Sequence, residues 1–272
     1  MRLLCHAFLL RIERLPMCLI TFSIQTNTEY PFVLTANRDE AYSRASLPIH
    51  EWEEPSNIIG GRDLKQGGTW LAFSKAGKFA ALTNYPFVER QVADPISRGF
   101  LIMDYLDSEI SASDYVSNLR YHREQFEGYH LLVGRIHPKI ELKMYNNVDD
   151  SLTNYAAGIH SISNTYDDLS AYRKSQSVKD LTHLMQGEID LNRMLKNFQN
   201  TESNPRLTDF PSFLTLDQAK KASGIFIEGQ GDFGTVSTTA IALDKSGKLS
   251  MKEVRYTREL GQEEIEIKFN FT

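Results

Sequence analysis

The sequence contains few residues of the kinds that mark secreted, membrane-spanning or nucleic-acid-binding proteins. Its 272 residues include two cysteines, Cys5 and Cys18, too few for the disulfide framework of a small secreted domain. No apolar run approaches the roughly 18 residues that a membrane-spanning helix needs. Lys and Arg number 30 against 35 Asp and Glu, which leaves no basic excess for binding nucleic-acid phosphates. We therefore expect a cytoplasmic protein without a membrane span or a nucleic-acid partner.

Metal-binding patterns are also missing from the sequence. The seven histidines are scattered, and none forms the H-E-x-x-H or paired spacing that suits zinc. What the chain does contain is 41% hydrophobic and 11% aromatic residues, enough for a substantial folded core. This composition indicates a globular protein with no metal site.

The first sixteen residues differ from the rest of the chain. An apolar patch lies between Arg2 and Arg11, but His6 interrupts it and no A-x-A-like cleavage site follows. A targeting segment and a mis-assigned translation start at Met17 are both compatible with this pattern. We expect residues 1–16 to be absent from the working protein or removed, and residues 17–272 to form a single domain.

The body of the chain contains strands in groups, interrupted by pairs of helices. Residues 18–24 and 32–37 predict a hairpin, and glycine-rich turns between residues 58 and 85 predict a meander. Helices are predicted near residues 100–106, after an Asp94-Pro95 cap, and in residues 113–126 and 170–198. Further strands follow up to the alternating residues 264–271. Without strand-helix alternation, the expected class is α+β, with antiparallel sheets and helices packed outside them.

Five polar residues next to apolar strands are candidates for chemistry: Cys18, Arg38, Asp39, Asn84 and Asn164. If Met17 is the initiator, its removal gives Cys18 a free α-amine beside its thiol. An α-amine has a pKa near 7.7–8.0, so it can act as the base for that thiol. Asp39 would then orient the amine, Arg38 would stabilise the thiolate and lower its pKa, and the two asparagines would donate to an oxyanion.

Each of these residues also has a structural interpretation. A lone cysteine in a strand is commonly a small buried hydrophobe. The run Asn37-Arg38-Asp39-Glu40 is compatible with a polar turn held by an Arg–Asp ion pair, and Asn84 and Asn164 with ordinary turn residues. Taken singly, none of these residues is specific for catalysis.

The order of short motifs along the chain is far more specific. Met17-Cys18 is followed by NRDE at residues 37–40, by GGTW and GKFAALTNY between residues 67 and 85, by ISN at 162–164, and by FGT-x-STT at 233–239. This order resembles the NRDE family, the family of the transport and Golgi organisation protein 2. The resemblance implies a four-layer αββα sandwich of the N-terminal-nucleophile hydrolase type, similar to penicillin V acylase and bile salt hydrolase.

The resemblance also carries roles onto this chain. It implies that Cys18 is the nucleophile, that Arg38 and Asp39 follow the second strand beside it, and that Asn84 and Asn164 complete the site. Two positions depart from the family pattern. Val236 stands where the family usually has an arginine, and residues 166–174 replace a family L-D-T-P-W-P-K segment of which Lys174 alone is kept.

Three functions are compatible with these residues. The first is a hydrolase that cleaves a C–N amide bond, or a thioester, through a Cys18 acyl-enzyme and needs no cofactor. The second, implied by the resemblance alone, is a non-catalytic carrier of haem, as in haem trafficking, or of a lipid or acyl-CoA. In that case Cys18 or His160 would ligate the haem iron. The third is a decayed hydrolase fold that serves as an interaction module. The partner expected for the first two is a small molecule, and the oligomeric state is open.

Overall fold

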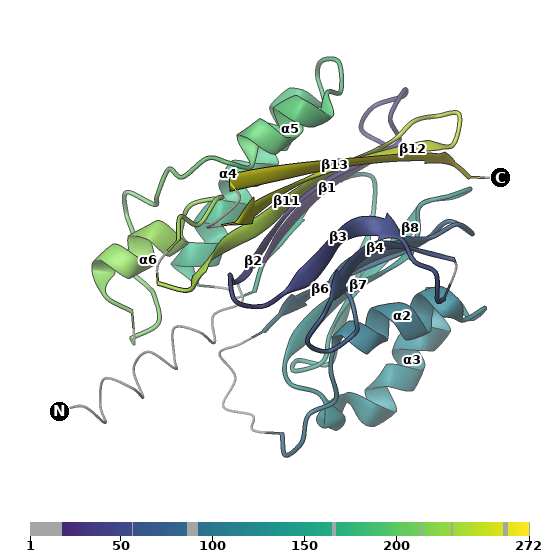
Figure 1. Cartoon of the computed structure of the whole chain (residues 1–272), viewed down its shortest axis with the longest axis horizontal. Coiled ribbons are helices and arrows are strands. Elements are labelled where there is room, and N and C mark those ends of the chain that lie inside the picture. Colours follow the sequence, from purple (N-terminus) through teal and green to yellow (C-terminus); the bar gives the residue numbers. More distant parts are fainter. Residues whose placement is uncertain are drawn as a thin grey trace.

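Two antiparallel sheets lie face to face, and helices cover the outer surface of each (Figure 1). The structure is a computed structural model that describes residues 18–55, 57–85, 92–164, 167–212, 214–229, 231–257 and 261–271. The expected removal of residues 1–16 concerns a segment outside these described residues.

The first sheet combines strands from the early and the late parts of the described chain. Its six strands occur in the order β10 (Gly158–Ile162), β1 (Leu19–Ile24), β2 (Phe32–Ala41), β11 (Phe233–Leu243), β12 (Lys248–Thr257) and β13 (Gly261–Asn270). The strands β1 and β2 form the predicted hairpin, with Leu19 opposite Asn37. On its other side β2 pairs with β11, so the N-terminal hairpin lies in the middle of the sheet.

The second sheet follows the order of the sequence. Its seven strands are β3 (Ser46–Glu51), β4 (Ile58–Asp63), β5 (Leu71–Ser74), β6 (Lys78–Asn84), β7 (Tyr129–Arg135), β8 (Glu141–Asn146) and β9 (Ser151–Tyr155). The predicted meander of residues 58–85 is therefore confirmed as β4, β5 and β6. The sequence did not predict β3 and β9, the two edge strands, because both are short and carry mostly exposed or half-buried residues.

The helices divide between the two outer faces. They are α2 (Gly99–Asp107), α3 (Ala112–His122), the short 3-10 helix η1 (Arg123–Gln125), α4 (Asp168–Leu184), α5 (Leu191–Asn197) and α6 (Leu216–Ala222). The predicted cap at Asp94 is wrong: α2 begins after Arg98, and Asp94 has a positive φ of 51°. Among the described residues, no helix has the length and apolar character to cross a bilayer.

Alternation along the strands creates three packed layers. Phe22, Leu34, Phe73 and Phe79 point between the sheets and form the central core, where each buried phenylalanine contributes roughly 1.5–3 kcal/mol. Residues of the opposite parity pack outward. Those of the second sheet meet α2 and α3, and those of the first sheet meet α4 and α5. Since β2 is buried on both faces, its polar residues must find partners in both layers.

Candidate functional site

Cys18 lies immediately before β1, at the end of the space between the sheets. Its side chain is buried, 9% exposed, and its backbone carbonyl accepts a hydrogen bond of 3.1 Å from Ser163 Oγ. A cavity of about 10 Å³ beside the thiol is lined by Asn37, Arg38, Trp70 and Thr239 together with apolar residues. A cavity of this size has room for about one water molecule. In the described chain the cysteine is therefore enclosed.

Arg38 reaches this cavity from β2, the strand next to Cys18. Its side chain is 6% exposed, and its guanidinium stacks 4.0 Å from the centre of the Trp70 ring. Nη1 donates to Ser46 Oγ at 3.0 Å, and Nη2 lies 3.4 Å from Asp63 Oδ2. Contacts with two strands of the opposite sheet therefore hold this cation beside the cysteine.

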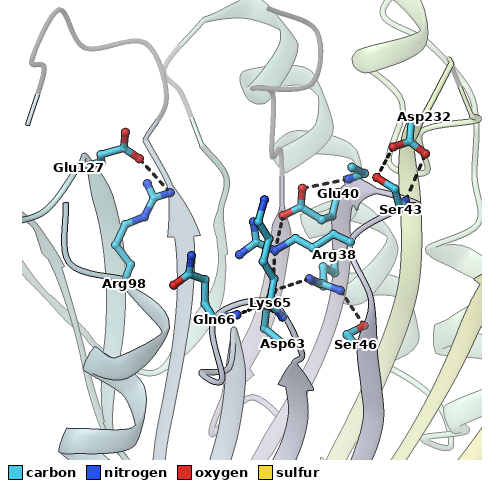
Figure 2. Close-up of polar contacts among 12 residues, drawn as sticks. Arg38, Glu40, Ser43, Ser46, Asp63, Lys65, Gln66, Arg98, Glu127 and Asp232 are labelled. Carbon is cyan, nitrogen blue, oxygen red and sulfur yellow. Dashed lines mark hydrogen bonds and ion pairs between the residues drawn. The ribbon is translucent and has the colours of Figure 1, made fainter. Parts of the chain in front are cut away.

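Asp63 is the centre of the polar cluster at the rim of the site (Figure 2). One carboxylate oxygen accepts from Arg44 Nε at 2.5 Å, and the other accepts from the backbone N–H groups of Lys65 and Gln66. Burial alone would raise the pKa of Asp63, but the hydrogen bonds from Arg44 and Gln66 bring it below its ordinary value. The carboxylate is thus held ionised, and it interacts more closely with Arg44 than with Arg38.

Asp39 points the other way, toward α4. Its Oδ2 accepts a hydrogen bond of 2.6 Å from Arg173 Nη2, and its Oδ1 accepts one of 2.6 Å from Thr235 Oγ1. The carboxylate is fully buried. An ion pair between Arg38 and Asp39 is therefore ruled out as the structural role of the motif, because the two residues pair with different partners on opposite faces of the sheet.

The NRDE motif is a stretch of strand and not a turn. Asn37 and Asp39 face the helices: Asn37 donates to the carbonyls of Phe198 and Ile225, each at 2.9 Å. Arg38 faces the opposite sheet, and Glu40 pairs with Arg44 at 3.7 Å. Alternation in β2 thus lets one tetrapeptide hold the helix layer with two residues and supply the cavity and its rim with the other two.

The two predicted asparagines do come together. Asn164 is fully buried, and its Nδ2 donates to the backbone carbonyl of Asn84 at 2.6 Å. The residue before Asn164, Ser163, hydrogen-bonds to the backbone carbonyl of Cys18 at 3.1 Å, although neither asparagine lines the Cys18 cavity. The ends of β6 and β10, from different sheets, therefore meet beside the cysteine.

The protonation state of Cys18 differs from the sequence-based expectation. Burial, and then the negative charge of Asp39, raise the pKa of the Cys18 thiol to about 12, although the backbone N–H of Asp39 and the Arg38 cation act in the opposite direction. The expected depressed pKa is therefore not found in the chain that continues upstream of Cys18. There the thiol is protonated, and its own nitrogen is in a peptide bond.

Sequence reasoning missed Arg173, Ser163 and His130. Arg173 occupies the buried stripe of α4 that includes Leu169, Ser177 and Leu181. A charged residue at such a position signals a buried counter-ion. Ser163 and His130 had no comparable signal, because their contacts join segments far apart in the sequence.

Two further features concern the surroundings of the candidate site. Val236, the position of the family arginine, falls in a β-bulge between Thr235, opposite Asp39, and Ser237, opposite Arg38. A larger groove, of about 480 Å³, lies over Lys179, His183 and Asn197 and shares no lining residue with the Cys18 cavity. We place the candidate site at the smaller cavity, because the cysteine and the NRDE arginine meet there.

His160 lies in β10, away from the Cys18 cavity. It pairs with Phe22, four residues along β1 from Cys18, and four residues of strand span about 13 Å. Its Nε2 lies 2.9 Å from the carbonyl of Ala156, and its ring packs against Phe22 and Tyr155. Cys18 and His160 therefore cannot ligate one haem iron together.

Comparison with known families agrees with the motif order. The Transport and Golgi organisation 2 family profile matches residues 17–258. The chain belongs to this family. The human homolog of Transport and Golgi organization protein 2 is 27% identical over 263 residues, which cover 87% of this chain and 92% of the human protein. The Drosophila melanogaster protein is 29% identical over 160 residues, covering 52% of this chain and 55% of the fly protein. The mouse homolog is 35% identical over 123 residues, 43% of this chain and 44% of the mouse protein.

The fold of this Transport and Golgi organisation 2 family member is shared with a solved amidase. The Caenorhabditis elegans ortholog of N-acylethanolamine-hydrolyzing acid amidase matches with a TM-score of 0.50 at 10% identity, covering 82% of this chain and 92% of that chain. At this identity the likeness concerns the fold alone. The fold is the predicted αββα sandwich of the N-terminal-nucleophile hydrolase type.

Proposed function

We propose that this protein, once its chain begins at Cys18, is an N-terminal cysteine hydrolase that cleaves an amide C–N bond or a thioester. The observation that carries the proposal is the position of Cys18. It lies at the start of β1 with Arg38 on the neighbouring strand, and the ends of β6 and β10 with Asn84 and Asn164 meet beside it. A buried structural cysteine would need no such convergence of polar groups.

The chemistry follows from removal of the residues before Cys18. The freed α-amine takes the thiol proton, and the thiolate attacks the carbonyl carbon of the substrate. Amide N–H groups of Asn84 and Asn164 stabilise the oxyanion. The C–N bond then breaks, the ammonium returns its proton to the leaving amine, and water hydrolyses the Cys18 thioester. Asp39 acts in this scheme by holding β2 through Arg173, and its backbone N–H faces the thiol.

Removal of the residues before Cys18 would also change the protonation of the Cys18 thiol. With a peptide bond at its nitrogen, Cys18 has a pKa raised to about 12 and is inert at neutral pH. A new α-ammonium next to the thiol adds a positive charge, and this charge lowers that pKa. The upstream residues would therefore keep the nucleophile silent until they are removed.

The test compares the full chain with a chain that starts at Met17. Intact mass identifies which residue is first, and the shorter chain contains one thiol, because Cys5 is absent from it. We expect that thiol to react with iodoacetamide at pH 7 at least about tenfold faster when Cys18 is the first residue. A panel of N-acyl amides and acyl thioesters should then leave an acyl group on Cys18, and Cys18→Ala should abolish it. A slow thiol in the processed chain, with no acyl adduct, would overturn the proposal.

The alternative is a carrier of haem or of a lipid or acyl-CoA. The enclosed, protonated thiol of the unprocessed chain fits a non-catalytic role, although Cys18 could ligate haem iron only as the thiolate. The measurement is a haemin titration of wild type and of the separate Cys18→Ala and His160→Ala variants. Saturable binding in a fixed stoichiometry that one of these substitutions abolishes would support the carrier, and a featureless titration would count against it.

A further inference from the structure

His130 lies in β7 of the second sheet and reaches the end of the first sheet. Its ring is 3% exposed. Nδ1 lies 3.0 Å from the backbone carbonyl of Ser163, and Nε2 lies 3.0 Å from Asn146 Nδ2. The histidine thus links its own sheet to the segment that follows β10.

The partners of the ring define its tautomer. The Ser163 carbonyl can only accept, so Nδ1 carries the hydrogen. Asn146 Oδ1 accepts from the backbone N–H groups of Val148 and Asp149, which turns the amide Nδ2 toward the histidine and makes Nε2 the acceptor. Burial lowers the pKa of His130 to about 4, so the ring is neutral at pH 7, as both hydrogen bonds require.

Ser163 passes this link on to the candidate nucleophile. Its carbonyl binds His130 and its Oγ donates to the carbonyl of Cys18 at 3.1 Å. The next residue, Asn164, donates to the carbonyl of Asn84 at 2.6 Å. The strand register also places His130 opposite Thr83, the neighbour of Asn84. One histidine therefore holds the segment that contacts both ends of the site.

We propose that His130 is a positioning residue that holds Ser163, and through it Cys18 and Asn164, in the geometry of the nucleophile site. The proposal rests on the function proposed above. His130 does not touch the thiol, so its effect passes through the Ser163 backbone. Its loss should therefore change the reactivity of Cys18 and leave the chemical groups of the site in place.

Two substitutions separate this role from a general contribution to stability. In His130→Asn the side-chain amide takes the place of Nδ1–H and can still donate to Ser163. In His130→Gln the amide extends to the place of Nε2, so it keeps contact with Asn146 but loses Ser163. Both remove the same buried ring. We expect similar losses of stability in urea, but different effects on Cys18.

The readout is the pH profile of iodoacetamide labelling in the chain that begins at Cys18. His130→Gln should label at least about tenfold more slowly than wild type at pH 7, since a misplacement of about 1 Å can cost roughly a hundredfold in rate. His130→Asn should stay within about twofold. Equal rates for two folded variants would overturn the proposal.

One further variant keeps the result decisive. If either histidine variant does not fold, Ser163→Ala replaces it, because it removes the bond to the Cys18 carbonyl while His130 stays. Unchanged labelling of Ser163→Ala would then overturn the proposal, and slower labelling would support it. Labelling needs no substrate. A rate that depends on His130 without any acyl adduct would therefore support the positioning role and reject the hydrolase.

Discussion

The ion pair between Asp39 and Arg173 gives the most direct test of the structure. Both side chains are buried, 0% and 1% exposed, and their closest atoms are 2.6 Å apart. Arg173→Met keeps much of the side-chain volume and removes the cation, which leaves the Thr235 hydroxyl hydrogen-bonded to a buried Asp39 carboxylate. Removing one partner of a buried pair costs about 3–5 kcal/mol, because the other charge stays buried without compensation.

A surface pair supplies the matched control. Lys245 and Glu29 lie 2.7 Å apart, but their side chains are 64% and 60% exposed. Lys245→Met should therefore change the free energy of unfolding by less than about 1 kcal/mol. The assay is urea unfolding at pH 7, with both variants compared to wild type. The geometric similarity of the two pairs means that burial is the main variable.

The pH dependence of the unfolding free energy of Arg173→Met gives a second check on the charge of Asp39. Burial already raises the pKa of Asp39, and Arg173 opposes that shift. Without Arg173 the pKa rises further, so the folded variant binds a proton that the unfolded chain does not. The variant then gains up to about 1.4 kcal/mol per unit as the pH falls from 7 toward the unfolded pKa near 3.9. Two results would refute an ionised Asp39 paired with Arg173. One is a loss of unfolding free energy in Arg173→Met at pH 7 no larger than that in Lys245→Met. The other is a difference between Arg173→Met and wild type that widens toward pH 5.

Two other substitutions test the walls of the Cys18 cavity. Burial raises the pKa of Glu253, which accepts from Ile49 N–H and Thr239 Oγ1, to about 7. The stability that protonated Glu253 contributes is complete below the unfolded pKa near 4.3 and is lost as the pH rises through 7. In wild type, the free energy of unfolding in urea should therefore fall by up to roughly 3 kcal/mol between pH 5 and 8, and Glu253→Gln should remove this fall. An unchanged pH dependence in Glu253→Gln would contradict this. A Cβ on Gly61 would lie 2.4 Å from the Trp70 ring, so Gly61→Ala should cost about 1–3 kcal/mol and shift Trp70 fluorescence in a Trp52→Phe background, whereas Gly187→Ala, with its nearest contact at 3.9 Å, should do neither.

The sequence predicted most of the strands, because their period of two is a local property. Residues 264–271 alternate cleanly and lie almost entirely within β13, and the hairpin of β1 and β2 follows from two apolar runs around a polar turn. The edge strands β3 and β9 lack this alternation of buried and exposed residues, so nothing in their sequences distinguishes them from loops.

The site was predictable as a set of residues but not as a set of contacts. Motif order selected Cys18 and Arg38, which meet at one cavity. It could not show that Asp39 pairs with Arg173, 134 residues away, because the choice of partner depends on which face of β2 meets which helix. Once β2 is known to be a strand, the alternation of its side chains decides that Asp39 faces the helices and Arg38 faces the opposite sheet.

The order of strands has a consequence for how the molecule assembles. The second sheet is one uninterrupted stretch, residues 46–155, in which each strand pairs with its neighbours in the sequence. Most of these pairings close short loops, which is fast, although the connection from β6 to β7 also contains α2 and α3. The first sheet instead joins β2 to β11, so that Asp39 meets Thr235 across 196 residues of chain. During synthesis the meander can form while β11 is still inside the ribosome, but the cysteine hairpin lacks its inner neighbour until the C-terminal strands emerge. The chemistry proposed for the first strand is therefore completed by a strand that is made much later than the hairpin itself.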